Sequence, residues 1–224
     1  MPLRHRIRLI FGTDEEKTHR CMEKYKELEP MPAFGFTPDA DFPIVSAEKG
    51  QINTRILFPQ GAGNAGCEGE YELLSFRSGV VANMVPEAAE AVVAGEEEPS
   101  KSWSRRIGHI ATITGIKAGV ETGEQAIKLY MAGKAAHGME PELGMNAGLA
   151  LIHFLKNYSW GESAGHYLHT VDTFLYDDVH GRALGIAMED ELSGKLTVNS
   201  GILQFDPGRN VFSYQFAFSG LRQL

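Results

Sequence analysis

The sequence has few cysteines, no long hydrophobic run and little positive charge, and each shortage excludes a class of protein. Its two cysteines, Cys21 and Cys67, have neither metal-binding nor redox spacing, so we expect no disulfide framework. No apolar run approaches the roughly 20 residues of a membrane span, and no signal-peptide core and cleavage site follow the basic start of the chain. The sequence therefore predicts a cytoplasmic protein that has no membrane partner.

Lysine and arginine together number 21, against 29 aspartates and glutamates, which gives a formal net charge of −8 at pH 7. Binding to a phosphate backbone requires an excess of positive charge, so this balance argues against a nucleic-acid partner. The remaining composition, 43% hydrophobic and 22% charged, is close to the globular norm and excludes collagen, a coiled coil and wholesale disorder. Metals and small substrates stay open as ligands, and the sequence does not determine the oligomeric state.

Hydrophobic periodicity predicts a mixed chain of strands and helices. We expect helices over about residues 14–29, 87–94, 145–158 and 167–175. We expect strands over residues 7–11, 42–45, 52–58, 71–77, 109–114, 126–131, 196–205 and 211–218, the last two joined by a hairpin turn. Residues 96–106 are charged and polar and are predicted to form an exposed loop. This order suggests two similar α+β halves after about residue 45.

Two patterns resemble ligand sites and are interpreted as structural. Residues 61–66 spell G-x-G-x-x-G, but a strand is expected after them where a dinucleotide site needs a helix, so a hairpin loop is favoured. His153, His166, His169 and His180 have no carboxylate or thiolate at a ligand-like interval. We interpret them as surface histidines or as histidines with a structural partner.

Three consecutive acids, Asp14, Glu15 and Glu16, follow the apolar run at residues 7–11. Acids in the first turn of a helix complement the helix dipole, which accounts for one or two of them. Alternatively, they lie at the carboxyl edge of a sheet, where α/β enzymes build their sites. Two adjacent carboxylates can then divide the work, because one binds a metal while the other takes a proton from metal-bound water. The pattern alone leaves both interpretations open.

Five segments, in consistent order along most of the chain, resemble the co-catalytic zinc dipeptidases of the PepV and Xaa-His dipeptidase type, which are related to carnosinases and aminoacylases. They are IRLIFGTDEE (residues 7–16), GFTPDADFP (35–43), ANMVP (82–86), GKAAHG (133–138) and PELGMNAG (141–148). The resemblance implies an α/β protein in two pieces. Residues 1–45 would be a partial catalytic, zinc-binding domain. Residues 46–224 would be an α+β lid of two similar halves, each an antiparallel sheet with helices on one face.

The resemblance also implies roles for individual residues, in an intact enzyme with two zinc ions. Glu15 matches the general base that deprotonates the water bridging the two ions. Glu16 matches a ligand of one zinc and Asp39 a ligand of the other. Asn83 and His137 match lid residues that reach the bound dipeptide, with His137 stabilising the oxyanion of the tetrahedral intermediate. Taken singly, Asp39 could be a turn residue and His137 a loop histidine, and their place in the series favours the functional interpretation.

The sequence departs from the family pattern in four places. No His-x-Asp element and no bridging aspartate precede Glu15, and the carboxy-terminal zinc-binding histidine is missing. In addition, Ala217 stands where the family has a substrate-binding arginine. We therefore hypothesise that the chain is an internal fragment whose last dozen or so residues are frame-shifted. A clean resequencing of the present reading frame would refute the frame shift.

These departures lead to an expectation about activity. Glu16 and Asp39 supply one protein ligand to each zinc ion, whereas catalytic zinc sites usually have three. We expect the chain alone to bind zinc weakly and to have little or no dipeptidase activity. Two alternatives stay open: a non-catalytic lid or interaction module, and an aminoacylase-type amidohydrolase that acts on N-acylated amino acids.

Overall fold

The computed structural model describes residues 5–14, 18–38, 49–58, 69–94, 97–114, 116–191, 193–207 and 212–220, with only the backbone described at residues 97–100, 113–114 and 212–220. The chain divides into two compact units, Met1–Ser46 and Ala47–Leu224. We refer to them as the N-terminal unit and the sheet unit and describe each by itself. Their identity as catalytic remnant and lid stays a prediction.

The described residues of the N-terminal unit contain one helix, α1 (Arg20–Leu28). It begins later than predicted, because the amides of Thr18 and His19 first close a turn on the Asp14 carbonyl, at 3.3 and 2.9 Å. The strand predicted at residues 7–11 is wrong: this segment has no regular structure and its hydrophobic side chains are exposed. A strand needs a hydrogen-bonded neighbour, and no described segment of this unit supplies one.

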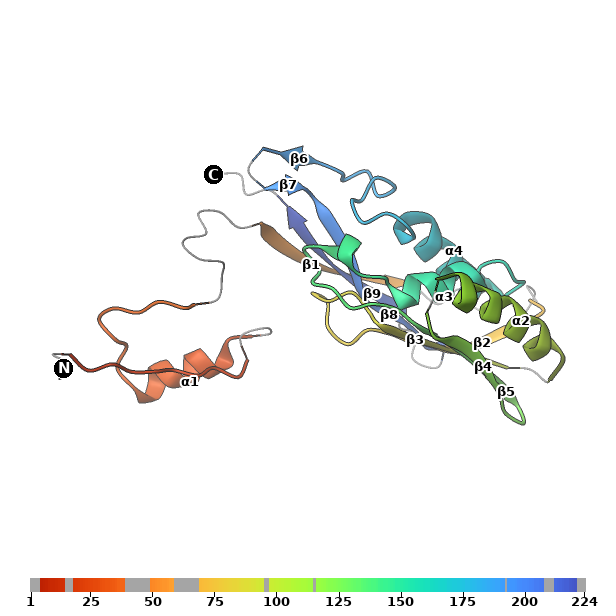
Figure 1. The fold of residues 1–224 in the computed structure, drawn as a ribbon, viewed down its shortest axis with the longest axis horizontal. Helices are drawn as coiled ribbons and strands as arrows, with labels where there is room; N and C mark the ends of the chain where they lie inside the picture. Colours follow the sequence, from red (N-terminus) through yellow and green to blue (C-terminus); the bar gives the residue numbers. More distant parts are fainter. Residues whose placement is uncertain are drawn as a thin grey trace. The chain divides into compact units, whose positions relative to one another are not determined.

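The sheet unit is built on seven strands, all paired antiparallel, in the order β1-β9-β8-β2-β3-β5-β4 (Figure 1). They are β1 (Gly50–Phe58), β2 (Glu72–Ser78), β3 (Ala88–Ala94), β4 (Ala118–Thr122), β5 (Ala126–Ala132), β8 (Thr197–Phe205) and β9 (Phe212–Gly220). A separate pair is formed by β6 (Glu189–Asp190) and β7 (Gly194–Lys195). The mixed α/β class and the antiparallel pairing are confirmed, whereas the division into two sheets is wrong, because the seven strands form one continuous sheet.

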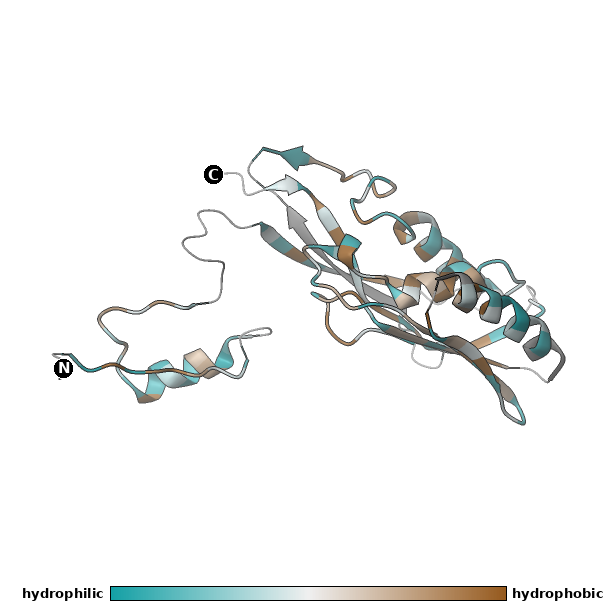
Figure 2. Cartoon of the chain, viewed as in Figure 1, coloured by the Kyte–Doolittle hydropathy of each residue, from teal (hydrophilic) through white to brown (hydrophobic). Residues whose placement is uncertain are grey.

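Three helices lie on one face of this sheet: α2 (Glu97–Thr114), α3 (Ala147–Leu155) and α4 (Glu162–Leu175) (Figure 1). A short 3₁₀ turn, η1 (Pro141–Leu143), precedes α3. Hydrophobic residues dominate α3 and alternate with polar ones along β5 (Figure 2). In β5 the side chains of Ile127, Leu129 and Met131 are buried, while Lys128 and Tyr130 face outward. This alternation is typical of an antiparallel sheet with one covered face.

Three predicted elements are corrected by the packing. Residues 87–94, predicted as a helix from their alanine content, form β3, because Ala89, Ala91 and Val93 alternate into the core. The predicted loop at 96–106 and strand at 109–114 form one helix, α2, whose buried residues Trp103 and Ile107 lie one turn apart. The charged residues of α2 hid this helical period.

The other predictions that fall on described residues of the sheet unit agree with the structure. Strands occur where residues 52–58, 71–77, 126–131, 196–205 and 211–218 predicted them, and helices where 145–158 and 167–175 did. The sequence reading missed β4. The predicted strand at 42–45 and the glycine-rich loop at 61–66 lie outside the described residues. No helix among the described residues is both long and apolar enough to cross a membrane.

Candidate functional site

Three of the predicted site residues, Glu15, Glu16 and Asp39, lie outside the described residues. Within the described part of the chain, no three His, Cys, Asp or Glu side chains are grouped so that they could hold a metal ion. The described residues therefore do not build a zinc site by themselves. The two zinc ions and their ligands stay a prediction.

The structure brings together the loops that carry the other two predicted residues, Asn83 and His137. Asn83 lies between β2 and β3, and His137 lies between β5 and η1. The two loops pair as a short antiparallel bridge between Met84 and His137. The Gly138 amide donates to the Asn83 carbonyl at 2.6 Å, and the Val85 amide donates to the Ala136 carbonyl at 2.9 Å. Two residues far apart in the sequence are thus neighbours in the fold.

The His137 ring is hydrogen-bonded to a neighbouring backbone amide. Its Nδ1 atom accepts a hydrogen bond from the Met139 amide at 3.2 Å. A neutral imidazole carries one proton, so accepting at Nδ1 places that proton on Nε2. The residue is exposed, so Nε2–H is a donor available to a ligand. Asn83 on the neighbouring loop is half-buried and carries an amide that can both donate and accept.

Strand β8 lies against the Asn83 loop and contributes a residue that the sequence reading did not single out. The buried Asn199 donates from Nδ2 to the carbonyls of Ala82 and Met84, at 2.7 and 2.9 Å. The register of the sheet pairs Asn199 with Ala217 of β9, and Ala217 in turn pairs with Asn53 of β1. Ala217, where the resemblance expects an arginine, is therefore the sheet partner of the residue that binds the Asn83 loop.

A cavity of about 1390 Å³ lies between α2, α3 and the covered face of the sheet. Val85, Gly144 and Asn199 line it, together with residues of α2 and α3 such as His109 and His153. Neither Asn83 nor His137 is among its lining residues. The cavity is therefore lined by residues next to the two loops, such as Val85 and Asn199, and not by the two side chains that are predicted to contact the peptide.

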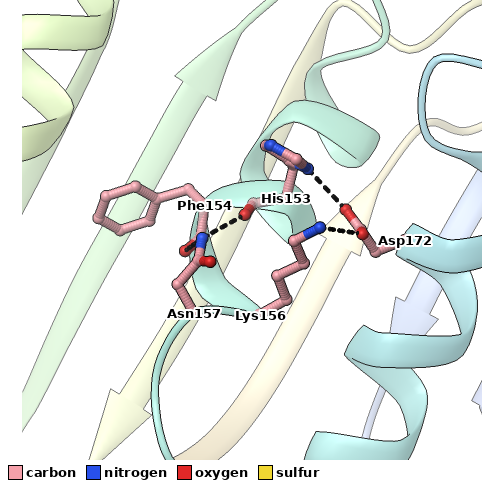
Figure 3. A network of polar contacts seen from close by, with 5 residues as sticks. All are labelled: His153, Phe154, Lys156, Asn157 and Asp172. Carbon is pink, nitrogen blue, oxygen red and sulfur yellow. Dashed lines mark hydrogen bonds and ion pairs between the residues drawn. The ribbon is translucent and has the colours of Figure 1, made fainter.

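His153 belongs to a polar network between α3 and α4 (Figure 3). Its Nδ1 lies 2.8 Å from the Asp172 carboxylate, which also accepts from the Lys156 ammonium. The ring stacks on Tyr176 with the centroids 3.7 Å apart. Burial, reinforced by the carboxylates of Asp177 and Asp172, raises the pKa of Tyr176. The network ties two helices together, so His153 has the structural partner that the sequence reading expected.

His180 also has such a partner, because its Nδ1 lies 2.9 Å from the Leu196 carbonyl. The ring of His166 packs edge-on against Phe58, with centroids 5.6 Å apart. These contacts agree with the interpretation of these histidines as structural.

No protein-family model matches the chain. It is 40% identical, over 93% of its length, to a Bacillus subtilis protein named "Putative dipeptidase YtjP". It is 36% identical, over 90% of its length, to "Putative dipeptidase SH1171" of Staphylococcus haemolyticus, and 34% identical over the same share to "Putative dipeptidase SAR1836" of Staphylococcus aureus. The chain covers 44%, 42% and 42% of these three proteins, so it spans less than half the length of the relatives it matches. Over nearly all of its own length, the chain is thus homologous to proteins named as dipeptidases.

Proposed function

We propose that this chain is part of a metal-dependent dipeptidase and that it supplies the two loops that contact the dipeptide. The observation that carries the proposal is the pairing of the Asn83 loop with the His137 loop through the Gly138–Asn83 hydrogen bond. The homology to proteins named as dipeptidases supports the substrate class. An exposed imidazole and an amide on two paired loops are suited to hydrogen-bonding the backbone and terminal groups of a short peptide.

In this proposal His137 donates from Nε2 to the oxygen that becomes negative as the peptide bond is attacked. Removing one such donor costs about 2.7–4 kcal/mol of transition-state stabilisation in other enzymes. Asn83 binds and orients the dipeptide from the neighbouring loop. Both side chains must hydrogen-bond to the same bound peptide, so the two loops need a fixed spacing.

The proposal assigns Glu15 to proton transfer and Glu16 and Asp39 to the binding of two zinc ions. These carboxylates amount to one protein ligand for each ion, and a catalytic zinc site usually has three. The three residues named here do not complete the metal site, so we derive no step through zinc. The chain alone is accordingly proposed to be inactive or nearly so.

Peptide binding is the first test. A titration of the isotope-labelled chain with the dipeptide L-alanyl-L-alanine, followed by NMR, is expected to shift the amide signals of Asn83, His137 and Gly138. The variant His137→Ala should weaken binding, while His169→Ala, which removes an exposed histidine of α4, should leave it unchanged. Absence of any shift would favour the non-catalytic module, and shifts with N-acetyl-L-alanine alone would favour the aminoacylase alternative.

Metal binding is the second test. Calorimetric titration of the chain with zinc chloride is expected to give weak binding that falls further in the double variant Glu16→Ala/Asp39→Ala. Two tight sites would contradict the proposed incompleteness of the metal centre. If the double variant releases the same heat of zinc binding as the unsubstituted chain, the assignment of Glu16 and Asp39 as zinc ligands is contradicted.

A further inference from the structure

We propose that Asn199 is a positioning residue that holds the Asn83 loop at a fixed spacing from the His137 loop. This role rests on the proposed function, because a fixed spacing between the loops matters only if both loops contact one ligand. The contacts that fix the spacing are present whether or not the proposed function is correct.

Asn199 carries a side-chain amide within β8, and it is only 1% exposed. Its single Nδ2 group donates to the carbonyls of Ala82 and Met84, at 2.7 and 2.9 Å. These two residues flank Asn83 in the sequence, so both sides of Asn83 are fixed to one side chain. Displacing the loop would take this donor away from both carbonyls, so the two bonds resist such a displacement.

The backbones of β8 and of the Asn83 loop also approach each other closely at Gly201. A Cβ atom on Gly201, two residues after Asn199, would lie 2.3 Å from the Ala82 carbonyl oxygen. The pairing of β8 with β9 is irregular between Ser200 and Ile202, which places Gly201 at a bulge. Only a residue without a side chain lets the loop come this near to β8.

The His137 loop closes on the Asn83 loop from the other side. A Cβ atom on Gly138 would lie 2.9 Å from the Asn83 carbonyl oxygen and 3.2 Å from Nδ2 of Asn199. The base of the His137 loop is fixed by two hydrogen bonds between Lys134 and Met145, at 3.0 and 2.8 Å. Asn199 and Gly138 thus meet at the Asn83 backbone, and moving either one changes the spacing of the two loops.

Asparagine 157 offers a matched control. Its Nδ2 group also donates to two main-chain carbonyls, those of His153 and Phe154, at 2.9 and 3.3 Å. Asn157 is exposed at the end of α3 and contacts neither loop through these bonds. Asn199→Asp and Asn157→Asp therefore make the same chemical change, and only the first replaces a donor to the Asn83 loop by a carboxylate facing two carbonyl oxygens.

The experiment is amide hydrogen exchange of the whole chain by NMR. Asn199→Asp is expected to accelerate exchange of the Val85 and Gly138 amides by about tenfold or more, since each donates across the loop pair. Exchange of the Leu129 amide in β5 should stay the same, as should the loop amides in Asn157→Asp. Equal exchange at Val85 and Gly138 in the two variants would overturn the proposal. If Asn199→Asp does not fold, Asn199→Ala, which removes the donor without adding a charge, replaces it, and the same exchange results decide.

A spectroscopic reading separates positioning from general stability. In the unsubstituted chain and in Asn157→Asp, L-alanyl-L-alanine should shift the signals of Asn83 and His137 together. In Asn199→Asp the shift at Asn83 should be lost at peptide concentrations that still shift His137. Joint retention of both shifts would overturn the positioning role. If the dipeptide shifts no signal in the unsubstituted chain, the proposed function fails, and the exchange result alone decides whether Asn199 holds the loops.

Discussion

The N-terminal unit and the sheet unit differ in whether their hydrophobic side chains have something to pack against. In the N-terminal unit Phe34 and Phe36 are 95% and 91% exposed, and none of its described residues is buried. In the sheet unit Phe76 and Phe205 are 0% and 2% exposed. Residues of one type thus have opposite environments. A buried core requires two packed layers, and among the described residues only those of the sheet unit form a helical layer on a sheet.

The largest expected difference between the units concerns truncation of a leucine. Leu151→Ala in α3 removes a fully buried side chain and should lower the free energy of unfolding by about 2–5 kcal/mol. Leu28→Ala in α1 removes a side chain that is 69% exposed, and should change it by about 0.5 kcal/mol or less. Urea unfolding followed by circular dichroism measures both. A similar cost for the two variants would contradict the contrast in packing.

Loss of an ion pair should also lower the free energy of unfolding more in the sheet unit than in the N-terminal unit. Asp172→Ala leaves His153 and Lys156 without their shared, buried acceptor, and should cost about 1–3 kcal/mol. Glu27→Ala removes the partner of Lys24 in α1, where both side chains are largely exposed, and should cost about 0.5 kcal/mol or less. The same urea titrations compare the two. An Asp172→Ala variant as stable as the unsubstituted chain would refute the role of this network as a tie between α3 and α4.

Helix capping gives a smaller contrast. Asn146 caps α3 by accepting from the Leu149 amide at 3.0 Å, so Asn146→Ala should cost about 1 kcal/mol. His19, at the cap position of α1, makes no side-chain capping bond and has a positive φ of 53°. His19→Gly removes the Cβ atom that this backbone conformation disfavours, and should increase the helical circular dichroism signal slightly. Loss of signal in His19→Gly would show that the imidazole itself stabilises α1.

The smallest effect is a pH dependence in the sheet unit. Burial raises the pKa of Tyr176 above its ordinary value near 10, so the folded state holds the phenol proton more tightly than the unfolded state does. The resulting stabilisation is fully present below about pH 10 and is lost as the pH rises through the folded-state pKa. Thermal melts should therefore show a smaller loss of stability above about pH 10 in Tyr176→Phe. Identical pH profiles would contradict the raised pKa.

The same comparison explains which parts of the fold were predictable. Hydrophobic residues recur every second position in residues 126–131 and about every 3.6 positions in residues 145–158. These periods match the buried faces of β5 and α3, so the local sequence was enough to predict both elements. Residues 7–11 have the composition of a buried strand, but no strand pairs with them in the part of the chain that the structure describes, and a local pattern cannot reveal this. The helix α2 was missed because Trp103 and Ile107 stand among charged residues and become buried only against the sheet and the rings of Tyr71 and Tyr158.

The candidate site was predictable only in part. Asn83 and His137 were identified from short segments, and their proximity follows from backbone pairing that no local pattern specifies. Asn199 was missed, because its role depends on carbonyls more than a hundred residues away in the sequence. A signal was present, since asparagine is depleted in strands and Asn199 lies inside the strand predicted over residues 196–205.

The central claim is that Asn83 and His137 act on one peptide, and a double-mutant cycle on dipeptide binding tests it most directly. The dissociation constant of L-alanyl-L-alanine is measured by NMR for the unsubstituted chain, Asn83→Ala, His137→Ala and the double variant. Residues that share a ligand and a hydrogen-bonded loop pair should show a coupling of about 0.5–3 kcal/mol. Losses that add within about 0.3 kcal/mol, or no loss in either single variant, would contradict the claim.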